Sequence, residues 1–197
     1  MTVSLRRLTA PEFHLLTPEL VDIYIDAMGY DPAIRSGRIA VWRQECRLAG
    51  FTSVIATERT DRGEFITGLA YGFSGTPRVW WHHQVMRGLK PRGLEDLGRD
   101  YFELAEIHVD PRRQSRGTGR GLLRELVWNQ PHPHVLLSTP EVENETNAAF
   151  HLYRSAGFSD VLRDFRFDGD SRRFAVLGAP LPLPGHPVSL GADHTRH

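Results

Sequence analysis

The residues best suited to bind a ligand lie in a glycine-rich turn between an expected strand and an expected helix. Residues 102–109 are mostly apolar with interspersed acids, and Asp-Pro follows, so a strand is expected to end there. Apolar residues then recur at helical spacing from position 122 onward. Between these elements lie Gly117, Gly119 and Gly121, together with arginines at 116 and 120. Such a turn presents free backbone N–H groups and the positive end of a helix dipole, which predicts a phosphate site.

Two common phosphate-binding motifs do not fit this turn. The P-loop of nucleoside triphosphatases requires Gly-Lys-Ser/Thr, and the sequence contains no Gly-Lys pair. The dinucleotide fingerprint requires three glycines at other spacings, at the first strand-to-helix turn of a βαβ unit. The turn therefore belongs to neither class.

The motif Gln114-x-x-Gly117-x-Gly119 resembles the acetyl-CoA motif of the GNAT acetyltransferase superfamily. A second segment, residues 147–158, is similar to the Asn…Ala…Leu-Tyr…Gly-Phe helix that follows the next strand in that superfamily. The two motifs occur in the family's order. The resemblance is specific over residues 102–158 and extends more loosely over 3–178.

The resemblance implies an α/β fold, with a mixed, mostly antiparallel central sheet flanked by helices on both faces. One GNAT domain would span residues 1–178, with an insertion at 75–101 between two strands. From residue 179 the chain is rich in Pro, Gly and His and has little periodicity, so 179–197 are expected to form a flexible C-terminal tail.

The resemblance also implies which residues hold acetyl-CoA, the expected co-substrate. The backbone of residues 107–109 would pair with the pantetheine arm like an added strand. The turn would hold the pyrophosphate, and Asn147 would contact the pantetheine arm, although an asparagine there also suits a helix cap. The candidate coenzyme-binding residues are Ile107, His108, Val109, Gln114, Ser115, Arg116, Gly117, Thr118, Gly119, Arg120, Gly121 and Asn147.

Acetyl transfer to an amine requires a base for the amine and a proton donor for the thiolate. Glu103 and Glu106 match acidic or polar positions in two branches of the family, and each is a candidate base. Because they are three residues apart on a strand, they are expected to face opposite sides, so that only one points into the cleft. Tyr153 matches the family tyrosine near the coenzyme sulfur and is the candidate acid. Cys46 lies far from the motif, which favours direct transfer in a ternary complex over an acyl-enzyme.

Residues 75–101 form a connection longer than the family's usual turn, and long connections are often functional. Trp80 and Trp81 within it are candidates for the acceptor side; the alternative is that both simply cover the edge of the core. Tyr24 is a third candidate, because in the family the first two helices flank the acceptor. Adjacent histidines at 82 and 83 lack a Cys or carboxylate at ligand spacing, so no metal is expected.

Local patterns predict the remaining elements. Strands are expected at 3–8, 51–60, 64–74, 134–139, 161–167 and 172–178, with Gly68 and Gly72 leaving room for a close neighbour. Thr17-Pro18-Glu19 predicts the start of the first helix. A second helix is expected over 32–49, with its buried side formed by Val41, Trp42, Cys46 and Ala49. Phe65, Leu69, Tyr71 and Phe73 are expected to share one face of the third strand.

Composition narrows the class of protein. The 197 residues carry 24 basic and 24 acidic side chains, so nothing indicates a general nucleic-acid surface. The lone cysteine excludes an internal disulfide framework and fits a reducing cytoplasm. No apolar run is long enough for a membrane span.

Together these patterns predict a cytoplasmic N-acetyltransferase, monomeric or homodimeric, that uses acetyl-CoA and acts on a primary amine of a small molecule. Two alternatives stay open. The acceptor could be an amine on a protein or peptide, or the chain could bind acyl-CoA without turnover, as a sensor or partner module.

Overall fold

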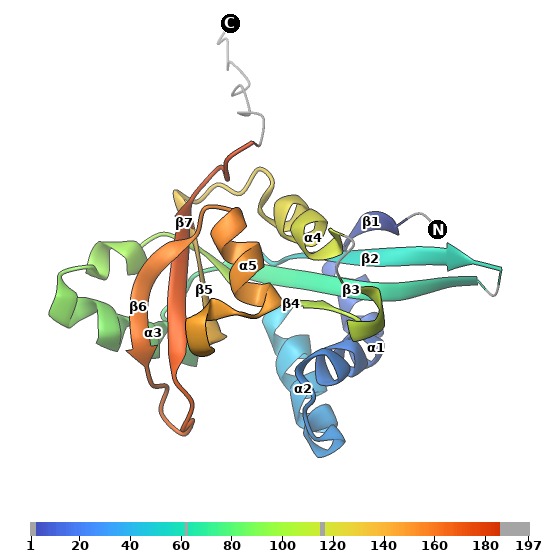
Figure 1. Cartoon of the computed structure of the whole chain (residues 1–197), viewed down its shortest axis with the longest axis horizontal. Helices are drawn as coiled ribbons and strands as arrows, with labels where there is room; N and C mark the ends of the chain where they lie inside the picture. Colours follow the sequence, from blue (N-terminus) through green and yellow to red (C-terminus); the bar gives the residue numbers. More distant parts are fainter. Residues whose placement is uncertain (1–2, 62, 115–116, 186–197) are drawn as a thin grey trace, which may run out of the picture.

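The computed structural model describes residues 3–61, 63–114 and 117–185, and these form one mixed sheet in the order β1-β2-β3-β4-β5-β7-β6 (Figure 1). Every neighbouring pair is antiparallel except β4 and β5, which confirms a mixed, mostly antiparallel sheet. The strands of the described chain are β1 (Val3–Leu8), β2 (Thr52–Thr60), β3 (Gly63–Ser74), β4 (Phe102–Val109), β5 (His134–Pro140), β6 (Ser159–Phe165) and β7 (Phe174–Pro180).

The parallel pair is short. β4 and β5 pair only at Phe102 with Val135 and at Glu103 with Leu136. Beyond Glu103 the two strands separate, and no other strand of the described chain pairs with the edge of β4 that faces β5. The backbone N–H and C=O groups along this edge are therefore free to pair with something other than the sheet.

Helices cover both faces of the sheet, as expected. The helices α1 (Ala10–Met28) and α2 (Arg35–Glu45) pack on one face of β2 and β3. The helices α4 (Thr118–Val127) and α5 (Ala148–Ser155) pack on the opposite face, against strands from β2 to β7. The helix α3 (Trp80–Leu89) covers β6 and β7. No helix within 3–185, the masked positions aside, is long and apolar enough to cross a membrane.

The first helix begins earlier than the sequence analysis expected. Thr9 caps it, and Thr9 and Glu12 bond each other's backbone N–H groups in a capping box. Thr17 lies about two turns after Thr9, and its hydroxyl donates to the carbonyl oxygen of Phe13 at 2.7 Å. The predicted start at Thr17 was wrong because the capping box upstream already satisfies the N-terminal donors, and Pro18 is accommodated inside the helix.

The second helix is shorter than predicted. A 3₁₀ turn at Pro32–Ile34 precedes the helix, which ends at Glu45. Gly50, further along the chain, takes a left-handed conformation at φ 69°. Trp42 and Cys46 are buried as expected. Val41 is 41% exposed and residue 49 is also exposed, which contradicts the prediction. Residue 49 follows the end of the helix, and Val41 lies beside Trp42 but on the solvent side.

Bulges change which side chains share a face of β3. The pairing of β2 with β3 shifts between Ala56 and Thr57, so Thr67 is an extra residue on β3. Phe65 is consequently 48% exposed, whereas Leu69, Tyr71 and Phe73 are buried against α1 and α2. Gly72 does allow a close neighbour, since a Cβ there would lie 2.2 Å from the carbonyl oxygen of Glu103.

Residues 75–101 fold into α3 and two 3₁₀ turns, Lys90–Arg92 and Glu95–Gly98. Val85 and Leu89 of α3 pack against β6 and β7. The insertion therefore forms a small core of its own with the C-terminal strands.

The expected tail begins later than residue 179. Ala179 belongs to β7, and Leu183 is buried against the core. The N–H of Leu181 donates to the carbonyl oxygen of Pro133 at 2.9 Å. Residues 186–197 lie outside the described part of the chain.

Candidate active site

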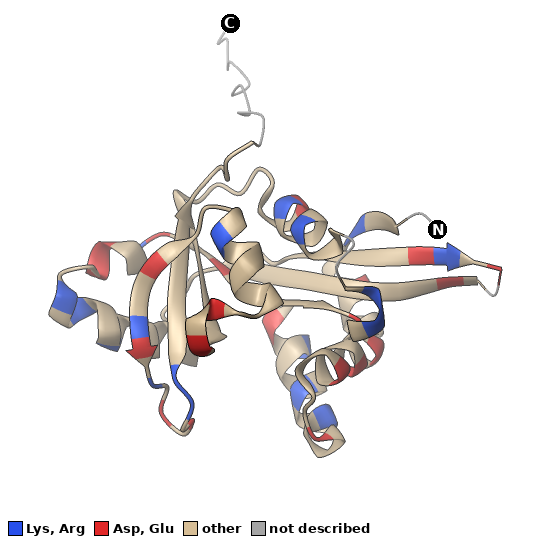
Figure 2. Ribbon diagram, viewed as in Figure 1, with Lys and Arg blue, Asp and Glu red and all other residues tan. Residues whose placement is uncertain are grey.

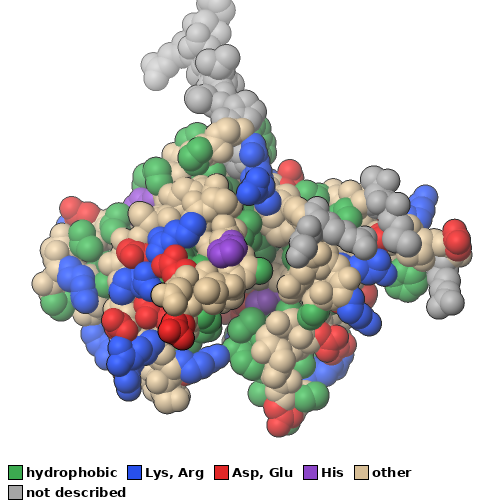
Figure 3. Space-filling model, in the orientation of Figure 1, with side chains coloured by type: hydrophobic (Ala, Val, Ile, Leu, Met, Phe, Trp, Pro, Cys, Tyr) green, Lys and Arg blue, Asp and Glu red, His purple; other side chains and the backbone are tan. Residues whose placement is uncertain are grey.

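A cavity of about 910 Å³ lies where β4 and β5 separate. Figure 3 shows the surface hollowed between the α1–α2 lobe and the rest of the molecule. The cavity walls come from α1, α2, α3, α5, β4 and the first turn of α4. Figure 2 shows acidic and basic residues interspersed over these elements.

At one end of the cavity, the turn after β4 leads into α4. Gly117 takes a left-handed conformation at φ 76° and starts the helix. The first N–H groups of a helix have no partner inside it, so those of Thr118, Gly119 and Arg120 point towards the cavity end. The side-chain amide of Gln114 donates to the carbonyl oxygen of Val109 at 3.2 Å, which ties the turn to β4.

Among the sequence candidates in this turn, Gly121 does not line the cavity, and two others are not described by the structure. Ser115 and Arg116 lie outside the described residues. Gly121 was expected to bind the coenzyme, but its N–H bonds the carbonyl oxygen of Gly117 within the helix, and its Cα faces Leu5 of β1. Position 121 is one residue too far into the helix to present a free donor.

The side chains of β4 alternate between the two faces of the sheet. Ile107 and Val109 pack against the α4–α5 core, and His108 points to the α1–α2 face. The backbone between them forms the free edge towards β5. These three residues line the cavity, as do Leu104 and Ala105.

Glu103 and Glu106 lie on the same face of the sheet, contrary to the sequence prediction. The register of β3 with β4 shifts between Tyr71 and Gly72, so that Tyr71 pairs with Glu106 and Phe73 with Glu103. The extra residue on β4 is Ala105, and it reverses the alternation expected from a regular strand. Both carboxyl groups therefore line the cavity on the α1–α2 side.

Glu103 is the more deeply buried of the two, at 5% exposed, and its Oε2 has no hydrogen-bond partner among the described residues. Desolvation, reinforced by the nearby charge of Glu45, raises the pKa of Glu103 well above its usual range.

Glu45, at the end of α2, is a third cavity carboxyl that the sequence analysis missed. The Tyr71 hydroxyl donates to its Oε2 at 2.6 Å. Burial, with the charge of Glu106 nearby, raises the pKa of Glu45 to about 7. The sequence did contain a signal for Glu45. Arg38, Trp42 and Glu45 share one face of the helix by their spacing, and Trp42 was already expected on its buried side.

Glu106 makes a pair with His108, whose Nε2 lies 2.6 Å from Glu106 Oε2. The ring of Tyr24 stands edge-on to His108, with centroids 5.0 Å apart. The guanidinium of Arg38 lies over the same Tyr24 ring at 5.1 Å. Tyr24, a candidate acceptor-binding residue, also lines the cavity.

Tyr153 reaches the cavity from the opposite side, on α5. It is 5% exposed, and burial raises its pKa above the usual value, with the negative charge of Glu106 adding to the effect. Tyr153 and Glu106 both line the cavity.

Asn147 caps α5, because its Oδ1 accepts the N–H of Phe150 at 2.9 Å, and it also lines the cavity. The loop before it is unusual. Asn144 and Glu145 both have left-handed backbones, at φ 52° and 54°, a conformation that is uncommon for residues other than glycine.

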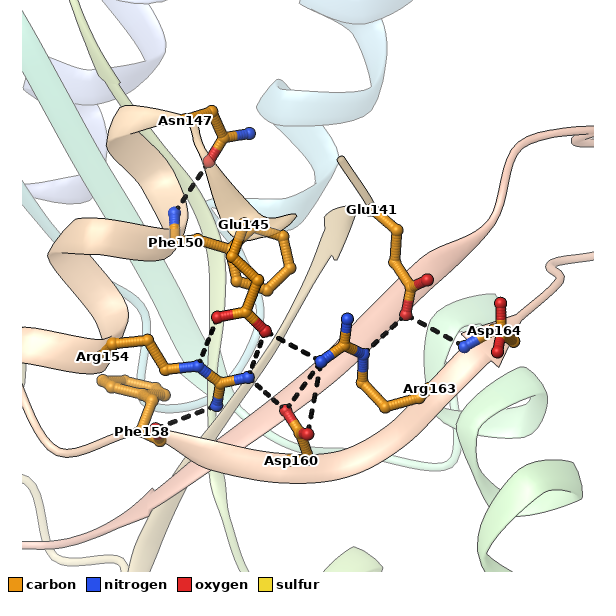
Figure 4. Close-up of polar contacts among 9 residues, drawn as sticks. All are labelled: Glu141, Glu145, Asn147, Phe150, Arg154, Phe158, Asp160, Arg163 and Asp164. Atoms are coloured by element: carbon orange, nitrogen blue, oxygen red, sulfur yellow. Dashed lines mark hydrogen bonds and ion pairs between the residues drawn. The ribbon is translucent and has the colours of Figure 1, made fainter. Parts of the chain in front are cut away.

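An ionic cluster holds this loop in place (Figure 4). Arg154 donates to both carboxylate oxygens of Glu145, at 2.9 and 2.6 Å, and Arg163 donates to one of them at 2.8 Å. The Arg154 guanidinium lowers the pKa of Glu145 to about 2. Because the two arginines come from α5 and β6, the cluster fixes the loop that delivers Asn147 to the cavity.

The insertion supplies the outer wall. Trp81 donates its indole N–H to the Ser138 hydroxyl at 2.9 Å, and Trp80 is 54% exposed and packs against Phe167. Both tryptophans line the cavity. His82 bonds the Tyr101 hydroxyl at 3.0 Å. No group of three or more His, Cys, Asp or Glu residues in the described chain could hold a metal ion.

One contact crosses the space between the two lobes. Arg172, in the β6–β7 turn, donates to the hydroxyl of Tyr30 at 2.8 Å. Tyr30 follows α1 and lines the cavity. The contact joins the C-terminal hairpin to the α1–α2 lobe beside the cavity.

A comparison with known proteins finds a relative of similar sequence. The chain is 38% identical over 188 residues to the GCN5-like protein acetyltransferase Rv2170 of Mycobacterium tuberculosis, covering 84% of this chain and 91% of that protein. This chain belongs to the GNAT acetyltransferase family. It is therefore an acyltransferase, although no single family model matches it.

Solved structures agree on the fold of this acetyltransferase. A GNAT acetyltransferase from Desulfovibrio desulfuricans superposes with a TM-score of 0.59 at 21% identity, covering 91% of this chain and 99% of that one. The acetyltransferase yncA of Salmonella typhimurium, solved with its cofactor acetyl-CoA, superposes with a TM-score of 0.58 at 15% identity, covering 96% and 99%.

Replacement of Gly119 by Glu should reduce acetyl-CoA affinity at least about 100-fold, because it places a negative charge among N–H groups suited to a phosphate. The fold should persist, since the nearest atom to a Cβ there is a Leu152 methyl at 3.4 Å. Calorimetric titration measures the affinity. The control is Gly37→Glu, in open space on α2. Equal affinity for both folded variants would exclude this helix end as the phosphate site.

Glu45 should make the protein less stable as pH rises. A carboxyl whose pKa is 4.5 unfolded and about 7 folded holds its proton more tightly in the folded state, so stability falls between these two values. Urea unfolding at pH 4.5 and 7.5 should show this fall reduced in Glu45→Gln by up to about 3 kcal/mol. Glu19→Gln, on the exposed side of α1, is the control. If the free energy of unfolding falls equally with pH in wild type and Glu45→Gln, Glu45 does not hold its proton more tightly in the folded state.

Proposed function

We propose that this chain is an N-acetyltransferase that moves the acetyl group of acetyl-CoA to a primary amine by direct transfer in a ternary complex. The observation that carries the proposal is that Tyr153 and Glu106 line one cavity, at the point where β4 and β5 separate. A proton donor and a proton acceptor on opposite walls are what attack by an amine on a thioester requires.

The residues present fit acetyl-CoA. The free edge of β4 offers backbone N–H and C=O groups to the amides of a pantetheine arm, along Ile107, His108 and Val109. The first N–H groups of α4 suit a pyrophosphate, and Arg120 adds positive charge beside them. Asn147 lies at the same wall. The bound coenzyme would supply an activated acetyl thioester.

Glu106 is the proposed base. Glu103 is almost fully buried, its Oε2 has no hydrogen-bond partner among the described residues, and burial raises its pKa well above its usual range. Glu106 is hydrogen-bonded to His108, which gives the proton a route away from the site. This arrangement supports the Glu106–His108 pair as the group that deprotonates the ammonium of the acceptor.

Tyr153 is the proposed acid. Its phenol is buried on the wall opposite β4, and its raised pKa keeps it protonated through the physiological range. A protonated phenol in an apolar wall is able to donate to a leaving thiolate. Cys46 is buried in the α1–α2 core and does not line the cavity, which fits transfer without a covalent intermediate on this thiol.

Two classes of acceptor compete. The three carboxyl groups and the aromatic walls of the cavity favour a small amine, as the sequence analysis expected. The name of the 38%-identical relative, a protein acetyltransferase, favours an amine on a protein. The release of free thiol from acetyl-CoA, measured with aliphatic amines, lysine peptides and peptides with free N-termini, tests both. Coenzyme binding without thiol release from any acceptor would point instead to an acyl-CoA-binding module.

Tyr153→Phe should lower kcat roughly 100-fold and leave acetyl-CoA affinity almost unchanged, since it removes only the proton donor. Stopped assays with the best acceptor give kcat, and calorimetry gives the affinity. Phe158→Leu, next to the same ring, controls for a packing effect. A full-rate Tyr153→Phe enzyme would remove this residue from the mechanism.

Glu106→Gln and Glu103→Gln should differ in their pH profiles. Loss of Glu106 should abolish the decline in kcat/KM on the acidic side, because the group whose protonation causes that decline is gone. Glu103→Gln should keep the wild-type decline, since Glu103 has no neighbouring group among the described residues to relay the proton as His108 does for Glu106. If the acidic decline disappears in Glu103→Gln and stays in Glu106→Gln, the assignment of the base is reversed.

A further inference from the structure

The mechanism leaves two carboxyl groups of the cavity unused. Glu103 comes from β4 and Glu45 from α2, and the two are close enough for the charge of Glu45 to act on Glu103. Neither forms an ion pair with any residue of the described chain. Acetylation of one acceptor amine needs one base, and Glu106 with His108 already provides it.

Glu103 also has an unmet hydrogen bond. Its side chain is almost fully buried, it lines the cavity, and its Oε2 lacks a partner among the described residues. A buried polar oxygen is normally satisfied, and one that is not is destabilising unless a ligand supplies the donor. An ammonium group has three N–H donors and positive charge, which match two neighbouring carboxyl groups.

The pair register sets the distance between the two carboxyl positions on β4. Glu103 pairs with Phe73 and Glu106 with Tyr71, and these partners are two residues apart on β3. Two strand residues span about 7 Å, which an extended diamine with four or five methylene groups matches. A spacer of this kind is apolar and slender.

The other groups facing this region suit such a spacer. Tyr24 and Tyr71 border it on the α1–α2 side, and aromatic faces attract alkylammonium groups. The guanidinium of Arg38 is close enough to Glu45 and Glu106 to act on both, and it lies over the Tyr24 ring.

We propose that Glu45 and Glu103 form a second cation-binding site beside the Glu106–His108 pair, and that the acceptor is a short linear diamine. One ammonium group binds between Glu45 and Glu103, while the other amine loses its proton to Glu106 and is acetylated. This inference rests on the proposed N-acetyltransferase activity and specifies its acceptor.

Acetyl transfer to 1,4-diaminobutane and to n-butylamine tests the proposal, because the two differ only in the second amine. The diamine should have a kcat/KM about 10- to 100-fold higher, the range expected for hydrogen bonds to a charged group. Glu45→Gln should remove most of this advantage by lowering the diamine value and leaving the butylamine value within about twofold. The amide oxygen of Gln can still accept the Tyr71 hydroxyl, so the cavity wall is preserved. Glu19→Gln should behave as wild type.

A binding measurement separates this inference from the activity itself. Calorimetric titration of 1,4-diaminobutane into the protein saturated with coenzyme A should show binding that Glu45→Gln weakens about tenfold or more. Equal kcat/KM for the two amines, or equal loss of both in Glu45→Gln, overturns the second site. Absence of diamine binding to the wild-type protein also overturns it. If a peptide amine is acetylated and diamines are not bound, the diamine site fails and the acetyltransferase proposal stands.

Discussion

The early separation of β4 from β5 is the constraint on which the site depends. After two residue pairs the strands diverge, and a stretch of β4 keeps its backbone donors and acceptors exposed inside the fold. Buried backbone groups are rarely left unpaired, so this edge is a binding surface by necessity. Both walls of the cavity follow from the gap, because α5 and Tyr153 lie on one side of β4 and α1, α2 and the glutamates lie on the other.

The bulge at Ala105 adds a second constraint. In a regular strand Glu103 and Glu106 would point to opposite faces, and the cavity would contain one of them. With one extra residue, both line the cavity, and their surroundings differ. Glu103 Oε2 lies without a hydrogen-bond partner among the described residues, whereas Glu106 lies against His108.

Sequence reasoning recovered the features that depend on local pattern. The turn from Gln114 to Gly119, the helix capped by Asn147, and the family fold all follow from motifs whose residues are close in the chain. It missed features that depend on register or on contacts between distant elements. The bulge leaves no mark in the apolar pattern of β4, and Glu45 meets Glu103 only because α2 packs across the sheet. The helix start at Thr9 was a different case, since the capping box Thr9-x-x-Glu12 was readable and Thr17-Pro18 was a competing signal.

The contact between Arg172 and Tyr30 bears on access to the cavity. It joins the β6–β7 turn to the α1–α2 lobe beside the cavity, and the turn is itself fixed to α3, where Gln84 bonds Asp168 in both directions. An acceptor too large to pass this contact enters, and its product leaves, only when the contact opens.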